Sequence, residues 1–151
     1  MSEIQLVKKD GALWPAYQSD KEAFEKIREG VALNASVKQP RNPQFHRKMF
    51  ALLNLGFDYW EPEEIDGIAA EKNFDRFRKD VLILAGHRRV VVNIKNEPRY
   101  EAESISFAKM DETEFNSVYK GVFSVIWKLV LSSVMSEDEA NAAVEELMSY
   151  S

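Results

Sequence analysis

The chain has 151 residues and a mass of 17.4 kDa, a length that favours one domain with a hydrophobic core of its own. It contains no cysteine, which excludes disulfides, zinc ribbons, iron–sulfur clusters and a thiol nucleophile. Lysine and arginine number 20 against 25 aspartates and glutamates, and the resulting net charge of −5 argues against a protein that coats DNA with its whole surface.

The first quarter of the chain predicts two strands, a helix and a further strand. Residues 4–7 and 13–17 flank Asp10-Gly11, a pair typical of tight hairpin turns because both positions need positive φ. A short helix follows, and Gly30 is a suitable residue to end it. Residues 31–38 then alternate between apolar and polar side chains, and this period of two predicts a strand with one apolar face.

The middle of the chain predicts two helices joined by an acidic loop. Asn42 is a natural N-cap and Pro43 suits the first helical position, so we expect a helix over residues 43–57. Residues 58–71 contain six acids and no base, which indicates a surface loop. Apolar side chains at helical spacing predict a second helix over residues 72–85, which Gly86 ends.

The last third predicts a second hairpin and two C-terminal helices. Residues 89–95 and 99–107 form the hairpin strands, a long helix covers residues 111–135, and a last helix begins after Ser136. From Val122 to Val134 the long helix is apolar nearly all round, so it lies either at the centre of the core or in an oligomer interface. We therefore expect a single α+β domain over residues 1–151 and, as a further expectation, a homodimer.

Targeting signals are not apparent in the sequence. The first 20 residues carry charges among short apolar stretches, and the most apolar run, residues 121–135, is shorter than a bilayer span and includes Lys128. These features predict a cytoplasmic protein with no membrane partner.

Basic residues are concentrated in two stretches of this acidic chain. Residues 38–48 hold four bases and no acid, and residues 72–99 hold eight bases against three acids. Such segregation permits a locally positive face that binds phosphate. The alternative, which we weigh about equally, is that these are solvated faces of helices and hairpins with balanced neighbours.

The start of the helix at Pro43 is the candidate nucleic-acid site. The first amide groups of a helix are unpaired and its dipole is positive there, so nearby cations create a place for a phosphate. The predicted site comprises Arg41, Asn42, Gln44, His46, Arg47 and Lys48, extended by Arg78, Arg88 and Arg89. The alternative is a capped helix with a solvated basic first turn.

The aromatic side chains favour the core in most positions and leave two alternatives for one of them. Phe57, Trp14 and Trp127 are predicted to lie in the core. Trp60 is either a core residue or a platform on which a base of a single strand stacks beside the basic groove.

Catalytic motifs are not found. The sequence has no phosphate-binding Gly-rich loop, no serine nucleophile elbow and no His-Glu-x-x-His helix, so we expect neither a catalytic residue nor a cofactor. Glu61, Glu63, Glu64 and Asp66 do not match a calcium loop and indicate a solvated segment. A metal-dependent nuclease stays open as a minor hypothesis because nuclease carboxylate motifs are degenerate.

Several sequence motifs are distinctive when taken together. Residues 41–57 read RNPQFHRKMFALLNLGF and are the most specific of them; FRKD at 77–80, LILAG at 82–86, SISFAKM at 104–110, and the pairs at 115–116, 118–119 and 126–127 accompany them. In these motifs the chain resembles a small family from tailed phages and prophages, domain of unknown function 1367. The resemblance implies a phage origin among recombination and replication accessories, so that the predicted cytoplasm is that of a bacterial host, and it brings no catalytic residue. A lesser similarity, over residues 47–53, is to phage recombination mediators of the NinB type.

Two functions follow as expectations. The first is a phage-encoded, non-enzymatic accessory protein that binds single-stranded or branched DNA, or a nucleic-acid-processing complex of host or phage, through residues 41–48. The alternative is a protein-binding inhibitor of host machinery or antiviral defence that uses the acidic loop and the terminal helices as its contact surface.

Overall fold

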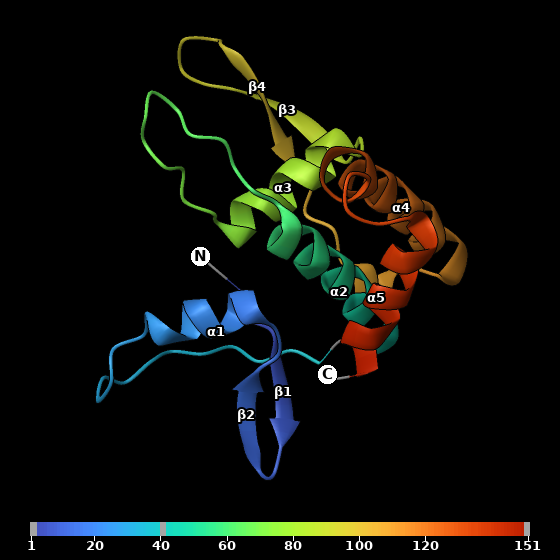
Figure 1. Cartoon of the computed structure of the whole chain (residues 1–151). Helices are drawn as coiled ribbons and strands as arrows, with labels where there is room; N and C mark the ends of the chain where they lie inside the picture. The colour runs from blue at the N-terminus through green and yellow to red at the C-terminus, as the bar shows by residue number, and fades with distance from the viewer. Residues whose placement is uncertain (1–2, 40–41, 150–151) are drawn as a thin grey trace.

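Figure 1 shows the computed structural model of the protein, which describes residues 3–39 and 42–149. Four helices pack into a helical body, and two separate antiparallel hairpins extend from different parts of it. The predicted α+β class is confirmed. In chain order the elements are β1 (Leu6–Lys9), β2 (Ala12–Pro15), α1 (Gln18–Glu25), α2 (Pro43–Tyr59), α3 (Phe74–Leu84), β3 (Arg88–Val92), β4 (Pro98–Ala102), the 3₁₀ turn Phe107–Lys109, α4 (Glu112–Ile126), the π-helical turn Trp127–Leu131, and α5 (Glu137–Ser149).

The first hairpin forms as its turn residues predict. Asp10 and Gly11 have φ of 52° and 78°, and β1 pairs with β2 so that Val7 lies opposite Trp14. The prediction that Trp14 belongs to the core is wrong, because its side chain is 56% exposed and its indole N–H donates to the Lys9 carbonyl. A two-stranded ribbon has no second layer of its own, so a large residue on it stays in solvent unless another element covers it.

The strand predicted over residues 31–38 is wrong. This segment is irregular, and among the described residues none of its backbone groups pairs with another backbone group. Its alternating apolar side chains are exposed, Val37 by 70%. A period of two predicts which side chains share a face, but a strand also needs a partner edge, and the described chain supplies none here.

Helix α2 is the centre of the core. Every residue from Met49 to Phe57 is buried, because α3, α4 and α5 all pack around this helix. At Gly56 the backbone of α2 lies against Ile126 and Phe77, where no side chain would fit. Polar Asn54 is buried too, and its amide oxygen accepts a hydrogen bond of 2.6 Å from the Ser19 hydroxyl, which ties α1 to α2.

The long C-terminal helix is continuous but changes its winding. Asp111 caps α4 by accepting from the Glu114 amide, at the place where the sequence predicts the helix to begin, and the helix widens into a π-turn at Trp127–Leu131. Val122, Ile126 and Leu131 are buried, whereas Leu129 is 68% exposed. The apolar run is therefore only partly in the core. Trp127, predicted as core, is half-buried, and its indole N–H is buried without a described acceptor.

The second hairpin has two different faces. β3 pairs with β4 so that Val90 lies opposite Tyr100 and Arg89 opposite Glu101. Residues directly opposite each other point to the same side of an antiparallel pair, so one face is mainly apolar and the other charged. Contacts between α3 and β4 hold the base of the hairpin, and its far end extends away from the helical body.

Candidate functional site

Helix α2 begins at Pro43 with Asn42 as its N-cap residue, as predicted. The side-chain amide of Asn42 donates to the Met110 carbonyl at 3.2 Å, which ties this helix start to the turn before α4. Gln44 is exposed on the first turn. Arg41, another predicted site residue, lies outside the described residues.

The next three predicted residues are directed to three different parts of the protein. His46 Nε2 lies 2.6 Å from the side-chain oxygen of Gln5 in the N-terminal segment. Arg47 donates to the Met148 carbonyl in the last turn of α5, and the Lys48 ammonium lies 4.6 Å from the centre of the Tyr119 ring on α4. Consecutive residues of a helix are rotated by about 100°, so a run of cations in sequence does not form a cluster in space.

Arg47 and Lys48 have favourable protein partners where they lie. The carbonyls of the last turn of a helix lack intrahelical donors and form its negative end, so an arginine stabilises the end of α5. An ammonium over a tyrosine face gains about 0.5–1 kcal/mol when exposed and more when it is desolvated. Both side chains therefore help to join α2 to its neighbours.

His46 and Arg78 are brought together around the Phe50 ring. The imidazole stacks on Phe50 with ring centres 4.4 Å apart, and the Arg78 guanidinium lies 6.0 Å from the centre of the same ring. Burial lowers the pKa of His46 below its ordinary value; the Glu3 carboxylate opposes this effect and Arg78 adds to it. The neutral imidazole is thus the form that this environment favours.

Arg78 is held by carboxylates. Its guanidinium lies 2.8 Å from the Asp75 carboxylate, one turn earlier in α3, and 3.8 Å from that of Glu3. Burial raises the pKa of Asp75, but hydrogen bonds from Lys79 and Arg78 outweigh it and the net shift is downward. Arg78 is therefore largely neutralised within the fold.

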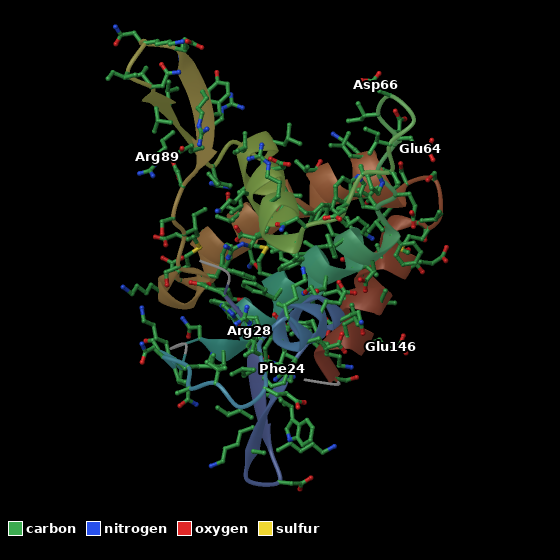
Figure 2. All side chains as sticks on the ribbon, turned by 90° about the vertical axis from the view of Figure 1, so that its left-hand side faces the viewer. Phe24, Arg28, Glu64, Asp66, Arg89 and Glu146 are labelled. Atoms are coloured by element: carbon green, nitrogen blue, oxygen red, sulfur yellow. The ribbon has the colours of Figure 1, made fainter. Side chains whose placement is uncertain are left out.

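Arg88 and Arg89 lie on the second hairpin, away from the start of α2 (Figure 2). The Arg88 guanidinium stacks 4.5 Å from the centre of the Tyr100 ring. Arg89 and Arg99 both contact the Glu101 carboxylate, at 3.5 Å and 2.8 Å. Of the predicted set, only His46 and Arg78 share one location, and the described cations do not converge around the amide end of α2.

The acidic segment after α2 forms an exposed projection, which we call the acidic loop and define as residues 61–71. Ile65 and Ile68 form a tight turn in which each amide donates to the other's carbonyl, at 3.0 and 2.9 Å. Asp66 and Gly67 occupy the turn with φ of 51° and 75°. Figure 2 shows Glu64 and Asp66 at the end of this projection, well separated from Arg89 on the hairpin.

The acidic loop presents apolar and acidic side chains together. Ile65 and Ile68 are 68% and 72% exposed. Within the described part of the chain, no carboxylate of the loop lies within ion-pair distance of a cation. The sequence prediction recognised the acids but missed the two isoleucines, although an Asp-Gly pair flanked by apolar residues is a hairpin signal.

An apolar groove lies between α3 and α4. A hollow of ≈ 420 Å³ is lined by Leu84, Ala85, Gly121, Ser124, Val125, Lys128 and Leu129. A second hollow, of ≈ 170 Å³, shares Leu84, Val125 and Leu129 with the first and reaches Asp80 and Trp60. We call the two together the α3–α4 groove. Trp60, for which the sequence left two alternatives, packs against Phe77 with ring centres 5.5 Å apart.

In the described part of the chain, no three histidine, aspartate or glutamate side chains gather where they could hold one metal ion. No helix there is both long and apolar enough to cross a bilayer.

A comparison with protein families finds one match. The family model described as "Protein of unknown function (DUF1367)" matches residues 1–66 and 63–150, which together cover nearly the whole chain. Neither the curated proteins nor the solved structures contain a match.

Proposed function

Since the chain belongs to the DUF1367 family of proteins of unknown function, a membership that brings no activity with it, we propose from its surface that it is a non-enzymatic protein that binds another protein. In this proposal it is phage-encoded and acts in the bacterial cytoplasm as an inhibitor or modulator of a nucleic-acid-processing protein. The acidic loop is its contact surface. Direct binding of nucleic acid, which the sequence predicts, is the competing function, and the experiments below also examine it.

The acidic loop carries this proposal because it combines a charge signal with an apolar anchor. Two isoleucines more than two-thirds exposed are costly to leave in water, since burying such a side chain contributes about 1.5–3 kcal/mol. The surrounding carboxylates have no cation within ion-pair distance in the described protein. Exposure to solvent explains the acids and the glycine of this loop, but it does not explain two exposed isoleucines at its tip.

The chemistry of the loop indicates the chemistry of its partner. An apolar tip flanked by acids fits a shallow apolar pocket with a basic rim. Proteins that process nucleic acids present basic surfaces to the phosphate backbone, so their working faces have the required charge. A loop of this kind would occupy such a face and exclude the nucleic acid from it.

The arrangement of the cations supports a protein partner over a polyanion. A phosphate backbone is bound by several cations arranged along one face. Here Arg47 contacts the end of α5, Arg78 is paired with carboxylates, and Arg89 shares the Glu101 carboxylate. To bind DNA, Arg47 and Arg78 would have to leave their partners in the fold, and Arg89 would have to leave a surface ion pair.

The test is capture of host proteins by the full-length chain and by two loop variants. Glu63→Lys/Glu64→Lys reverses the charge, and Ile65→Ser/Ile68→Ser removes the apolar tip. We expect the wild type to capture a nucleic-acid-binding protein and both variants to lose it. Added duplex DNA should release the partner, because DNA and the loop would compete for one basic surface.

The matched control is Glu25→Lys/Glu29→Lys, which makes the same change in net charge at the exposed end of α1. This control should retain the partner. Capture that survives both loop variants, or that the control abolishes equally, would count against the acidic loop. Failure of all forms to capture any protein, together with direct binding of DNA, would replace this proposal with the nucleic-acid one.

A further inference from the structure

We propose that two copies of this chain form a symmetric dimer in which the β3–β4 hairpin of each copy lies in the α3–α4 groove of the other. The inference goes beyond the proposed function and uses none of the acidic loop. It rests on two complementary surfaces, the apolar face of the hairpin and the α3–α4 groove, which the fold keeps apart within one molecule.

The first feature is an apolar hairpin face that lies open except where the Arg88 guanidinium stacks on the Tyr100 ring. Val90, Val92 and Tyr100 share this face, and all three are more than half exposed. At the turn that joins the strands, Ile94 is 100% exposed. The opposite face is satisfied by the Arg89–Glu101–Arg99 ion pairs, so it needs no partner. An isolated two-stranded hairpin is marginally stable in water, and a partner over its apolar face would support it.

The second feature is the α3–α4 groove. Its lining is aliphatic at Leu84, Val125 and Leu129, and the first and last of these are exposed by 58% and 68%. The groove has a volume of ≈ 420 Å³, and its polar lining is limited to Ser124 and Lys128, with Asp80 in the second hollow. Its chemistry suits apolar side chains such as Ile94 and Val92.

The fold keeps these two features apart within one molecule. The hairpin begins only four residues after Leu84, which lines the groove, yet Figure 1 shows the hairpin extending away from α4. The groove of each copy is therefore open to the hairpin of another. When each copy places its hairpin in the groove of the other, the hairpin face and the groove of both copies are covered. The two contacts are related by a two-fold axis, so the assembly stops at two subunits and does not grow into a filament.

The charges around the two surfaces permit this contact. The hairpin turn carries Lys95 and Glu97, and the groove carries Lys128 and Asp80, so each has one base and one acid. Opposite charges can thus face each other when the turn enters the groove. The acidic loop, by contrast, contains five acids and no base, and two copies of it would repel each other. Among the exposed apolar projections of the C-terminal two-thirds, the hairpin is therefore the one suited to a second copy.

The test uses the lack of native cysteine, because any introduced thiol is then unique. Ile94→Cys and Leu129→Cys are made in differently tagged full-length chains, mixed and mildly oxidised. We expect a disulfide-linked heterodimer in the mixture. The matched control pairs Ile94→Cys with Ile68→Cys. The side chain of Ile68 is about as exposed as that of Leu129, but it lies on the acidic loop and outside the groove. This control pair should cross-link only at the rate of random collision.

Light scattering of the unmodified chain gives the second measurement. We expect a mass of about 35 kDa, twice the 17.4 kDa of one chain, at high micromolar concentration. Ile94→Asp should weaken the dimer roughly ten-fold or more, because burial of an isoleucine side chain is lost in each of the two copies. Ile68→Asp should leave the dimer unchanged.

Three results would overturn the proposal: a monomer at every concentration, a dimer that Ile94→Asp leaves intact, or no excess of the Ile94–Leu129 cross-link over the control. Loss of partner capture by the acidic-loop variants bears only on the proposed function. The two conclusions can therefore fail separately.

Discussion

At the scale of single residues, position on a helix decides what a charged side chain does. The sequence places His46, Arg47 and Lys48 next to one another, but their side chains contact the N-terminal segment, α5 and α4 respectively. The order of residues in the sequence could predict that this helix start is basic and that Asn42 stands at its N-cap position. It could not predict that the carbonyl of Met148, 101 positions later in the chain, would be the acceptor for Arg47.

His46 supplies a prediction about pH. Its pKa is lower in the folded protein than the ordinary value of 6.5, mainly because it is buried, so the unfolded chain binds the proton more readily. Its contribution to the free energy of unfolding is complete above about pH 6.5 and is lost as the pH falls below that value. The slope from one such group is at most about 1.4 kcal/mol per pH unit.

The comparison that isolates this effect is His46→Gln, measured by urea denaturation at a series of pH values. Glutamine keeps a donor for Gln5 but does not titrate. We expect the variant to lose stability less steeply than the wild type between pH 6.5 and the acid range where carboxylates begin to titrate. Equal slopes for the two proteins would show that His46 is not buried as neutral imidazole.

At the scale of secondary structure, the elements with strong local signals form where the sequence predicts them. The Asp10-Gly11 turn, Asn42 at the N-cap position of α2, the start of α4 near Asp111, and the stop at Gly86 all appear in the structure. The strand expected over residues 31–38 fails because pairing is not a local property. Periodicity also could not tell which helix is central, since this depends on how many neighbours pack around it, and α2 has three.

The packing of α2 against α4 gives a prediction with an internal control. A Cβ at Gly56 would lie 2.7 Å from Ile126 Cγ2 and 3.2 Å from Phe77 Cζ, and both of those side chains are buried. Gly56→Ala should therefore destabilise the protein by about 1–3 kcal/mol through overpacking. Gly121→Ala meets nothing closer than 3.9 Å and should stabilise α4 by up to about 1 kcal/mol.

Thermal or denaturant unfolding of the two alanine variants measures the change in the free energy of unfolding for each. The account predicts opposite signs for the same chemical change in two helices. A Gly56→Ala variant as stable as the wild type would mean that α2 and α4 are not in close contact at this crossing.

At the scale of the whole molecule, several cations of the predicted site contact other parts of the fold, and three segments carry apolar side chains outward. The segment 31–38 and the β3–β4 hairpin expose aliphatic residues that sequence periodicity alone would assign to one buried face, and the acidic loop exposes two isoleucines. The candidate nucleic-acid residues could be predicted as basic but not as dispersed, because their convergence depends on tertiary contacts. The acidic loop and the β3–β4 hairpin expose acidic or apolar side chains, and such projections favour protein partners.

The most direct measurement of this claim is a fluorescence anisotropy titration of labelled single-stranded and duplex DNA with the full-length protein at low salt. The account predicts no saturable binding, because Arg47, Arg78 and Arg89 are occupied by protein groups. Saturable binding that weakens steeply with salt would contradict it, provided that the two variants Arg47→Ala and Lys48→Ala also change the salt dependence. Each variant should then lower the slope of log binding constant against log salt concentration by about one, the value for one lost phosphate contact.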